Sequence, residues 1–310
     1  TCRITGNRSP ASALDTTLDC GASPIPSFTD QLRLCTRLAV YCHLARKACC
    51  RMSETASSDQ PVASRLMRPG FGTIAYHTLE GKTPTIVFLG GLMSDMTGTK
   101  ALALDAHCRA NQRSFIRFDY TGHGQSDGAF EDGTIGDWHR DALSVIDDLT
   151  TGPLILVGSS MGGWQMLLAA LARPDRVAGL VGVAAAPDFT ENLMWDTFDQ
   201  RTRDLLIADG IVHMPSDYDD SSYPITRALI EDGRDHLVLG GPMAFDGPVR
   251  LLHGMVDADV PWQVSLQITE RLTSTNVITT FIKDGDHRLS SATQLARLTA
   301  AVEEVAAHCE

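Results

Sequence analysis

The sequence predicts an α/β fold in which a mostly parallel central sheet is flanked by helices. Short, continuous apolar runs, such as residues 86–89 and 154–157, are typical of strands that are buried on both faces. Amphipathic helix patterns separate these runs, and a Gly/Ser-rich turn at residues 158–163 joins one strand directly to a helix. Because alternating strands and helices form parallel sheets with both faces covered, we expect one domain of this kind.

The expected elements follow one another in a regular order. Each strand is a short apolar run, and each helix repeats its apolar residues with the helical period. We expect strands at residues 71–78, 85–90, 114–120, 154–157, 177–185, 249–253 and 277–282. We expect helices at residues 97–108, 134–149, 161–172, 263–272 and 293–307. The helix at 134–149 is amphipathic, with apolar residues on one side and acidic residues opposite.

Residues 188–245 interrupt this order and are predicted to form a small helical lid between the strands expected at 177–185 and 249–253. Helices are expected at 191–208 and 225–237, with a proline-containing loop between them. Apolar side chains of the lid, and one from the loop after the second strand, are candidates to line a substrate pocket: Met93, Met194, Trp195 and Phe198. The alternative for the lid residues is that they only hold the lid against the core.

The first 51 residues differ from the rest in charge and in cysteine content. They hold seven Lys and Arg against three Asp, a net charge of +4, and six of the eight cysteines. We therefore predict that residues 1–51 are a disordered leader or upstream extension, followed by a linker at 52–68 and the folded domain at 69–310. The alternative is a mitochondrial transit sequence, because basic and apolar residues alternate at 32–47, although the three Asp oppose it.

The remaining residues carry a net charge of −16, since the whole chain carries −12. This charge argues against nucleic acid or an anionic membrane as a partner. The chain has no run of about 18 apolar residues, so no membrane span is expected. With few cysteines the main domain suits a reducing compartment, and we expect a cytoplasmic location, or a mitochondrial one if the leader is a transit sequence. No zinc-like ligand spacing occurs, and no metal, cofactor or oligomeric state is predicted.

The pattern Gly158-x-Ser160-x-Gly162 lies between an expected strand and an expected helix. In this setting it is typical of a nucleophile elbow, a sharp turn that presents a serine at the end of a sheet. The glycines let neighbouring backbone approach closely, and the helix N-terminus offers unpaired N–H groups to an oxyanion. Because an ordinary glycine-rich turn has the same pattern, the assignment of Ser160 as nucleophile depends on its partners.

A serine nucleophile needs a base and an acid that orients the base. Sheets with such an elbow place both after the serine, just past the ends of later strands. We assign His287 as the general base and Asp257 as the acid that orients it. Asp259 is the rival acid, and Asp286 is interpreted as a neighbour of the base. Five other histidines are interpreted as strand-end, turn or helix-surface residues: His253, His123, His139, His236 and His308.

An oxyanion hole needs two preorganised N–H donors. We expect the first to be the N–H of Met161, the residue after the nucleophile. The second should come from the loop at residues 90–93, where we favour Leu92 N–H over Met93 N–H.

Residues 69–308 resemble the α/β-hydrolase superfamily. Besides the elbow, the resemblance is carried by the Asp-x-x-Gly-x-Gly-x-Ser turn at 119–126 and the His-Gly-x-x-Asp-x-x-Val-Pro loop at 253–261. The resemblance implies an α/β-hydrolase fold and a Ser-Asp-His triad. The chain departs from the pattern at Gly90, where many members of the superfamily have a histidine.

Within the superfamily, two segments are similar to the mitochondrial depalmitoylase and acyl-glucuronide esterase group and its bacterial relatives. They are Leu-Gly-Gly-Leu-Met-Ser-Asp-Met-Thr-Gly-Thr-Lys-Ala at 89–101 and Asp-Ala-Asp-Val-Pro-Trp at 257–262. This similarity implies hydrolysis of carboxylic esters or acyl thioesters.

The leading hypothesis is a serine hydrolase that cleaves a small-molecule carboxylic ester through an acyl-Ser160 intermediate. An acyl-protein (palmitoyl) thioesterase is the first alternative, because the same triad can cleave a thioester. The alternative from another class is a non-catalytic binding protein with the hydrolase fold.

Overall fold

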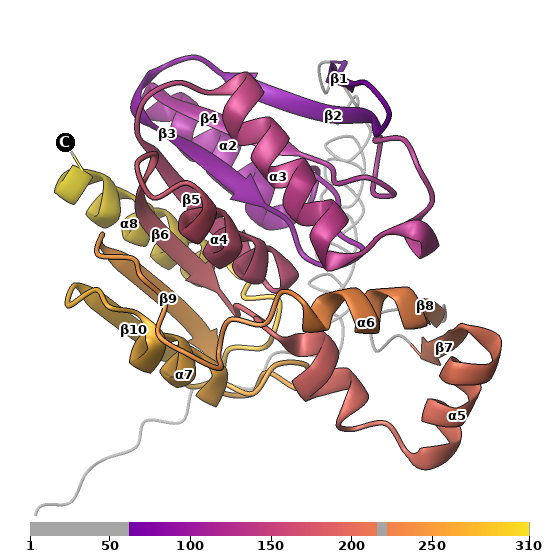
Figure 1. The fold of residues 1–310 in the computed structure, drawn as a ribbon. Coiled ribbons are helices and arrows are strands. Elements are labelled where there is room, and N and C mark those ends of the chain that lie inside the picture. Colours follow the sequence, from indigo (N-terminus) through magenta and orange to yellow (C-terminus); the bar gives the residue numbers. More distant parts are fainter. Residues whose placement is uncertain (1–61, 216–221, 310) are drawn as a thin grey trace, which may run out of the picture. The chain divides into compact units, whose positions relative to one another are not determined.

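The computed structural model describes residues 62–215 and 222–309, which contain an eight-stranded sheet (Figure 1). Across the sheet the strands are β1 (Ser64–Arg68), β2 (Gly72–Leu79), β4 (Arg113–Phe118), β3 (Lys82–Leu89), β5 (Leu154–Ser159), β6 (Val177–Val183), β9 (Val249–Gly254) and β10 (Val277–Ile282). β2 runs antiparallel to both of its neighbours, and all other neighbouring strands are parallel. The predicted α/β fold is therefore confirmed.

Helices cover both faces of this sheet, and they correspond to the expected helices with small shifts at their ends. They are α2 (Thr99–Ala110), α3 (Ile135–Leu149), α4 (Met161–Ala172), α7 (Gln263–Arg271) and α8 (Ala292–Cys309). Successive strand residues point to opposite faces. Thus Val87 of β3 packs in one core cluster with Trp138 of α3 and Trp164 of α4, whereas Ile86 packs in a second cluster with Leu104 of α2.

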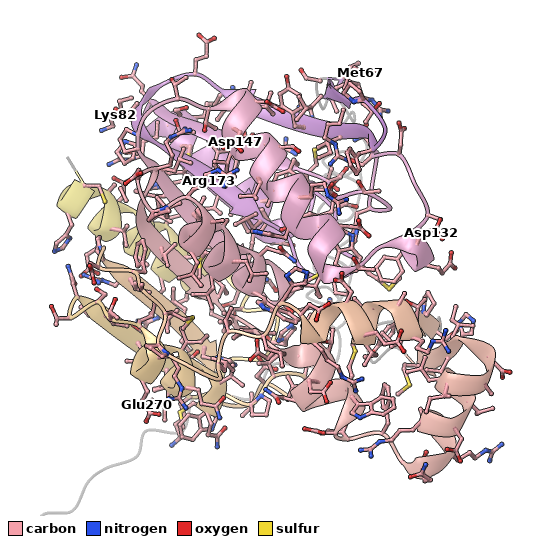
Figure 2. All side chains as sticks on the ribbon, viewed as in Figure 1. Met67, Lys82, Asp132, Asp147, Arg173 and Glu270 are labelled. Carbon is pink, nitrogen blue, oxygen red and sulfur yellow. The ribbon has the colours of Figure 1, made fainter. Side chains whose placement is uncertain are left out.

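The outer side of α3 carries ordinary surface ion pairs. Asp147 of α3 lies 2.6 Å from the guanidinium of Arg173, the residue that follows α4 (Figure 2). Both side chains are partly exposed, at 39% for Asp147 and 33% for Arg173. Pairs this exposed contribute about 0–1 kcal/mol to stability, because water screens them.

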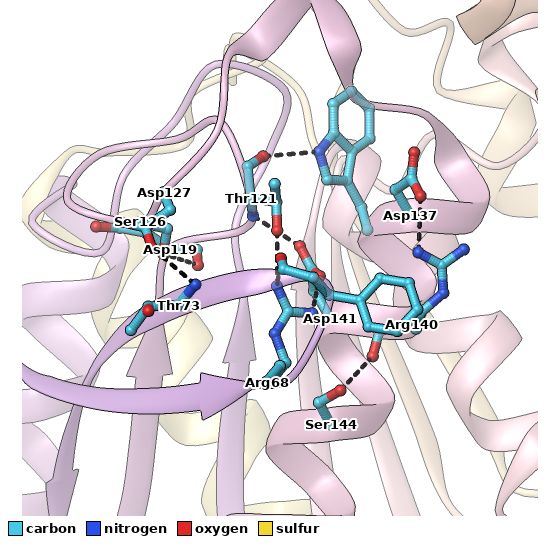
Figure 3. A network of polar contacts seen from close by, with 12 residues as sticks. Arg68, Thr73, Asp119, Thr121, Ser126, Asp127, Asp137, Arg140, Asp141 and Ser144 are labelled. Atoms are coloured by element: carbon cyan, nitrogen blue, oxygen red, sulfur yellow. Dashed lines mark hydrogen bonds and ion pairs between the residues drawn. The ribbon is translucent and has the colours of Figure 1, made fainter.

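The inner side of α3 carries a charge that the sequence pattern did not predict. Asp141 was expected on the acidic outer side, but it is 2% exposed and forms an ion pair with Arg68 at the end of β1 (Figure 3). Arg68 falls in the segment expected to be a linker. That expectation is wrong for residues 64–68, because these residues pair with β2 as an edge strand of the sheet.

We expect Asp141→Asn to lower the free energy of unfolding by about 3–5 kcal/mol, because it leaves the buried Arg68 guanidinium without a counter-charge. Asp147→Asn is the matched control on the same helix, and it should cost at most about 1 kcal/mol. Urea denaturation of the two variants measures both values. Equal losses of stability would show that the Arg68–Asp141 pair is no more important than a surface pair.

The insertion at 188–245 holds less helix than predicted. The expected helix at 191–208 is broken into a π-helix, η2 (Thr190–Trp195), and a separate α-helix, α5 (Gln200–Asp209). The break has a local cause, because the Asp199 side chain accepts a hydrogen bond from Thr202 N–H at 2.8 Å and caps a new helix there. The first half of the predicted lid therefore has two short helices.

The second half of the insertion contains a β-hairpin where a loop was expected. Strands β7 (Ile211–Pro215) and β8 (Ser222–Thr226) pair antiparallel, and α6 (Arg227–Arg234) follows directly. Thr226 caps α6 by accepting a hydrogen bond from Leu229 N–H at 3.1 Å. A short 3-10 helix, η1 (Phe130–Asp132), precedes α3 elsewhere in the chain.

In the part of the chain that the structure describes, no helix has both the length and the apolarity needed to cross a membrane. The predicted leader at 1–51 and most of the predicted linker at 52–68 lie outside the described residues.

Candidate active site

Ser160 stands at the sharp turn between β5 and α4, as the sequence predicts. Its backbone has φ +55° and ψ −122°, a conformation that a residue with a side chain rarely adopts. Backbone hydrogen bonds hold it there, because Ser160 N–H donates to Val183 O at 3.0 Å and Ser160 O accepts from Gly163 N–H at 2.8 Å. Backbone strain of this kind costs about 1–3 kcal/mol and is characteristic of functional sites.

The glycines on either side of Ser160 allow β5, α4 and β3 to approach one another closely. A Cβ atom on Gly158 would lie 2.3 Å from the Gly162 carbonyl oxygen, and one on Gly162 would lie 2.0 Å from the Leu89 carbonyl oxygen. No larger residue fits at either position without moving the backbone. The Gly-x-Ser-x-Gly pattern is therefore a packing requirement here.

His287 and Asp257 lie beside Ser160, on the loops that follow β10 and β9. Nε2 of His287 is 3.0 Å from Ser160 Oγ, and Nδ1 of His287 is 2.8 Å from Asp257 Oδ2. The two strands are parallel neighbours that end in register at Ile282 and Gly254. The structure thus brings together the three side chains that the sequence analysis selected, in a continuous hydrogen-bonded chain.

The Asp257 carboxylate is fully buried and surrounded by donors. Oδ1 accepts the backbone N–H groups of Asp259 at 2.9 Å and Val260 at 2.8 Å, while Oδ2 faces His287 and His253. Burial alone would raise the pKa of Asp257, but the hydrogen bonds from His253, His287 and Val260 outweigh burial and hold the pKa well below its usual value. Asp257 is therefore ionised at neutral pH.

His253 contacts Asp257, and this contact was not predicted from the sequence. Its side chain is completely buried, with Nδ1 2.7 Å from Ser265 Oγ and Nε2 2.9 Å from Val260 O. Because the carbonyl can only accept, Nε2 carries the hydrogen, and it also points toward Asp257 Oδ2 at 3.3 Å. The signal in the sequence was the four-residue spacing of His253 and Asp257 within the motif.

Asp286, the expected neighbour of the base, and Asp259, the rival acid, occupy different positions. Asp286 accepts a hydrogen bond from Leu289 N–H at 3.0 Å and shapes the loop that carries His287. Asp259 is exposed, and its carboxylate lies close to the acid–base pair. In the described part of the chain, Asp257, Asp259 and His287 are the one group of three side chains whose possible metal-ligating atoms lie within 4.8 Å of one another. Two of its three members hydrogen-bond to each other.

The loop at residues 90–93 passes next to Ser160. A Cβ atom on Gly91 would lie 3.3 Å from Ser160 Cβ, so the loop backbone is in contact with the elbow. Met93 N–H donates to His123 Nε2 at 3.1 Å and is therefore occupied. The N–H groups of Leu92 and Met161 have no acceptor among the described residues. This geometry favours Leu92 over Met93 as the second donor.

Comparison with known proteins places the chain in a family. A family model described as alpha/beta hydrolase fold matches residues 84–212. The mitochondrial palmitoyl-protein thioesterase ABHD10 of Bos taurus is 42% identical over 243 residues, which cover 78% of this chain and 79% of that protein. This chain belongs to the α/β-hydrolase family.

Two solved structures match this α/β hydrolase over most of its length. Mouse alpha/beta hydrolase domain-containing protein 10 has a TM-score of 0.74 at 40% identity, over 78% of this chain and 97% of that one. A putative hydrolase from Agrobacterium vitis S4 has a TM-score of 0.76 at 39% identity, over 80% of this chain and 100% of that one. The predicted resemblance to the depalmitoylase group and its bacterial relatives is confirmed.

In this α/β hydrolase, Lys100 of α2 supports the loop that carries the histidine. Its ammonium donates to the Arg288 carbonyl at 2.6 Å, one residue beyond His287. Burial lowers the pKa of Lys100 to about 8, although Asp286 nearby opposes this shift. The sequence gives no local sign of this role, because the partner of Lys100 lies 188 residues away.

The four predicted pocket residues of this α/β hydrolase have different environments. Phe198 is buried in the core cluster, and Met194 packs partly buried against that cluster. The guanidinium groups of Arg203 and Arg234 lie over the Trp195 ring, 5.2 and 4.8 Å from its centroid. Met93 is 52% exposed beside the site. Packing against the core or within the lid explains the environments of Phe198, Met194 and Trp195. Contact with a substrate stays a prediction for all four residues.

Proposed function

We propose that this chain is a serine hydrolase that cleaves carboxylic esters or acyl thioesters through an acyl-Ser160 intermediate. The observation that carries the proposal is the hydrogen-bonded chain from Asp257 through His287 to Ser160 Oγ. The unoccupied N–H groups of Leu92 and Met161 beside it supply the second requirement of acyl transfer, a site for the oxyanion.

The geometry suits a two-step reaction. Nε2 of His287 takes the Ser160 hydroxyl proton while Oγ attacks the acyl carbon, and the resulting oxyanion is stabilised by the N–H groups of Met161 and Leu92. Collapse of this intermediate breaks the bond to the alcohol or thiol, which leaves with the proton from His287. A water molecule then attacks the acyl-Ser160 ester in the same way. Asp257, ionised throughout, stabilises the imidazolium formed in each step.

The names of the relatives favour an acyl-protein thioester as the substrate class. The ABHD10 proteins of cattle and mouse, 42% and 40% identical to this chain, are named palmitoyl-protein thioesterases. We infer an acyl chain attached through sulfur or oxygen, with either a small molecule or a protein as leaving group. The same names include the word mitochondrial, so we propose a mitochondrial location in place of the cytoplasmic one, to be tested by fractionating cells that carry the tagged chain.

Initial rates on matched oxygen-ester and thioester series, from acetyl to palmitoyl, test this function on the full chain. We expect hydrolysis in both series, with the faster rates on long-chain thioesters. Faster rates on short oxygen esters would instead indicate a general carboxylesterase. The absence of hydrolysis in both series, together with no labelling of Ser160 by a fluorophosphonate, would contradict the proposal and favour the non-catalytic binding protein.

A further inference from the structure

His123 lies in the turn after β4, directly behind the loop at residues 90–93. Its side chain is enclosed by three aromatic rings in edge-to-face contact, with centroid distances of 5.8 Å to Tyr120, 5.3 Å to Phe130 and 5.2 Å to Trp138. The residue is 4% exposed. This enclosure leaves the imidazole little freedom to rotate, so its two nitrogen atoms point in fixed directions.

The hydrogen bonds of His123 determine which nitrogen carries the proton. Nδ1 lies 3.2 Å from the Thr121 carbonyl, which can only accept, and Nε2 lies 3.1 Å from Met93 N–H, which can only donate. The ring is therefore neutral, with its hydrogen on Nδ1 and a lone pair on Nε2. Burial lowers the pKa of His123, which favours the same neutral form.

The hydrogen bond from Met93 N–H to His123 Nε2 holds the loop at residues 90–93 in an unfavourable backbone conformation. Met93 has φ +56°, which is unfavourable for a residue with a side chain, and the turn is closed on its other side by Ser94 N–H donating to Gly91 O at 3.1 Å. Between these two fixed points lies the peptide N–H of Leu92. Its direction depends on both bonds.

We propose that His123 is a positioning residue for the oxyanion hole: by accepting Met93 N–H it keeps the Leu92 N–H directed at the acyl oxygen of the substrate. The inference rests on the proposed function of Ser160, and it adds a residue that the sequence analysis interpreted only as part of a turn. His123 does not touch the reacting atoms, so its effect passes through the backbone at residues 92 and 93.

His123 contacts the carbonyl of Thr121, and Thr121 belongs to a polar network with Arg68 and Asp141 (Figure 3). The Thr121 carbonyl also accepts the Trp138 indole N–H at 3.1 Å, and Thr121 N–H donates to Asp141 Oδ2 at 2.6 Å. Arg68 donates to Thr121 Oγ1 at 2.8 Å and forms the buried ion pair with Asp141. The turn that carries His123 is thus anchored to β1 and α3.

The test compares His123→Gln with His123→Asn. A glutamine places its amide oxygen near the position of Nε2, whereas the amide of asparagine lies near the position of Nδ1 and cannot reach Met93 N–H. Of the two variants, only His123→Gln therefore keeps an acceptor for Met93 N–H. We expect His123→Asn to lower kcat by about tenfold to hundredfold with KM nearly unchanged, since a misdirected donor costs less than a missing one. His123→Gln should recover most of the lost rate.

A second readout separates positioning from a general loss of structure. A trifluoromethyl ketone forms an oxyanion on the nucleophile, so its affinity should fall in His123→Asn by the same factor as kcat/KM, while thermal melting of the two variants stays similar. Equal kcat in both variants, or a rise in KM alone, would overturn the inference while leaving the proposed hydrolase intact. A wild-type chain without Ser160-dependent hydrolysis would overturn the proposed function and this inference with it.

Discussion

Replacing Ser160 with alanine is expected to lower kcat by about 10⁶-fold, the largest effect of any single substitution in this chain. The reason is that, among the residues the structure describes, Ser160 carries the one hydroxyl that hydrogen-bonds to His287. Ser160 Oγ is the atom that His287 Nε2 contacts at 3.0 Å, and it lies at the N-terminus of α4, where unpaired N–H groups face the site. Steady-state rates on the best substrate of the ester and thioester series give the measurement.

Two further variants control for damage to the fold. Ser159→Ala removes the neighbouring hydroxyl, which is buried at the end of β5, and should keep most of the activity. Ser160→Gly should be inactive yet more stable than the wild type by about 1 kcal/mol, because glycine adopts φ +55° without strain. If Ser160→Ala kept more than a few per cent of the wild-type rate, the nucleophile would have to be a different residue.

The central strands and the elbow could be predicted from sequence because their causes are local. Strands such as β5 and β6 are buried between helices, so nearly every residue is apolar or glycine. The elbow combines that signal with glycines at two positions where a Cβ atom would collide with backbone. Both kinds of evidence lie within about ten consecutive residues.

The partners of Ser160 are distant in sequence, yet topology made them predictable. His287 lies 127 residues beyond Ser160, and Asp257 lies 30 residues before His287. In a parallel sheet every strand delivers its following loop to the same edge. A search limited to loops after β9 and β10 therefore reduces ten histidines to one candidate, even though no distance is available from sequence.

The parts that could not be predicted depend on contacts between distant residues. Asp141 looks like one of several acids on α3, and its burial follows from Arg68, which lies 73 residues earlier on an edge strand. Similarly, His123 gains its contact with Met93 through a loop 30 residues away. In both cases the residue type is uninformative, because histidine and aspartate are common in exposed turns and helices.

The lid was mispredicted for a different reason. Apolar residues at 191–208 recur with a helical period, which favours one helix, but the cap at Asp199 competes locally and restarts the helix. The hairpin was missed because Pro224 lies within β8, and proline argues against a strand. A two-stranded ribbon tolerates it, since β8 has one neighbour and so one unpaired edge.

The second large effect is expected at Asp257. Replacement by asparagine should lower kcat on the order of 10⁴-fold, because the amide cannot stabilise the imidazolium and favours the wrong tautomer of His287. The surroundings of this carboxylate make the effect specific. Two backbone N–H groups point at Oδ1 and two histidines face Oδ2, so a neutral amide there would direct its N–H₂ group at a donor.

Asp259→Asn is the matched comparison, since the two aspartates lie two residues apart on one loop. Its carboxylate is exposed, whereas that of Asp257 is fully buried and bonded to His287 Nδ1. Loss of the charge at Asp259 costs little, because water solvates the exposed side chain. Loss of the charge at Asp257 leaves two backbone N–H groups and two histidines without an anion. Asp259→Asn should therefore change kcat little, and a larger loss there than in Asp257→Asn would show that Asp259 orients the base when substrate is bound.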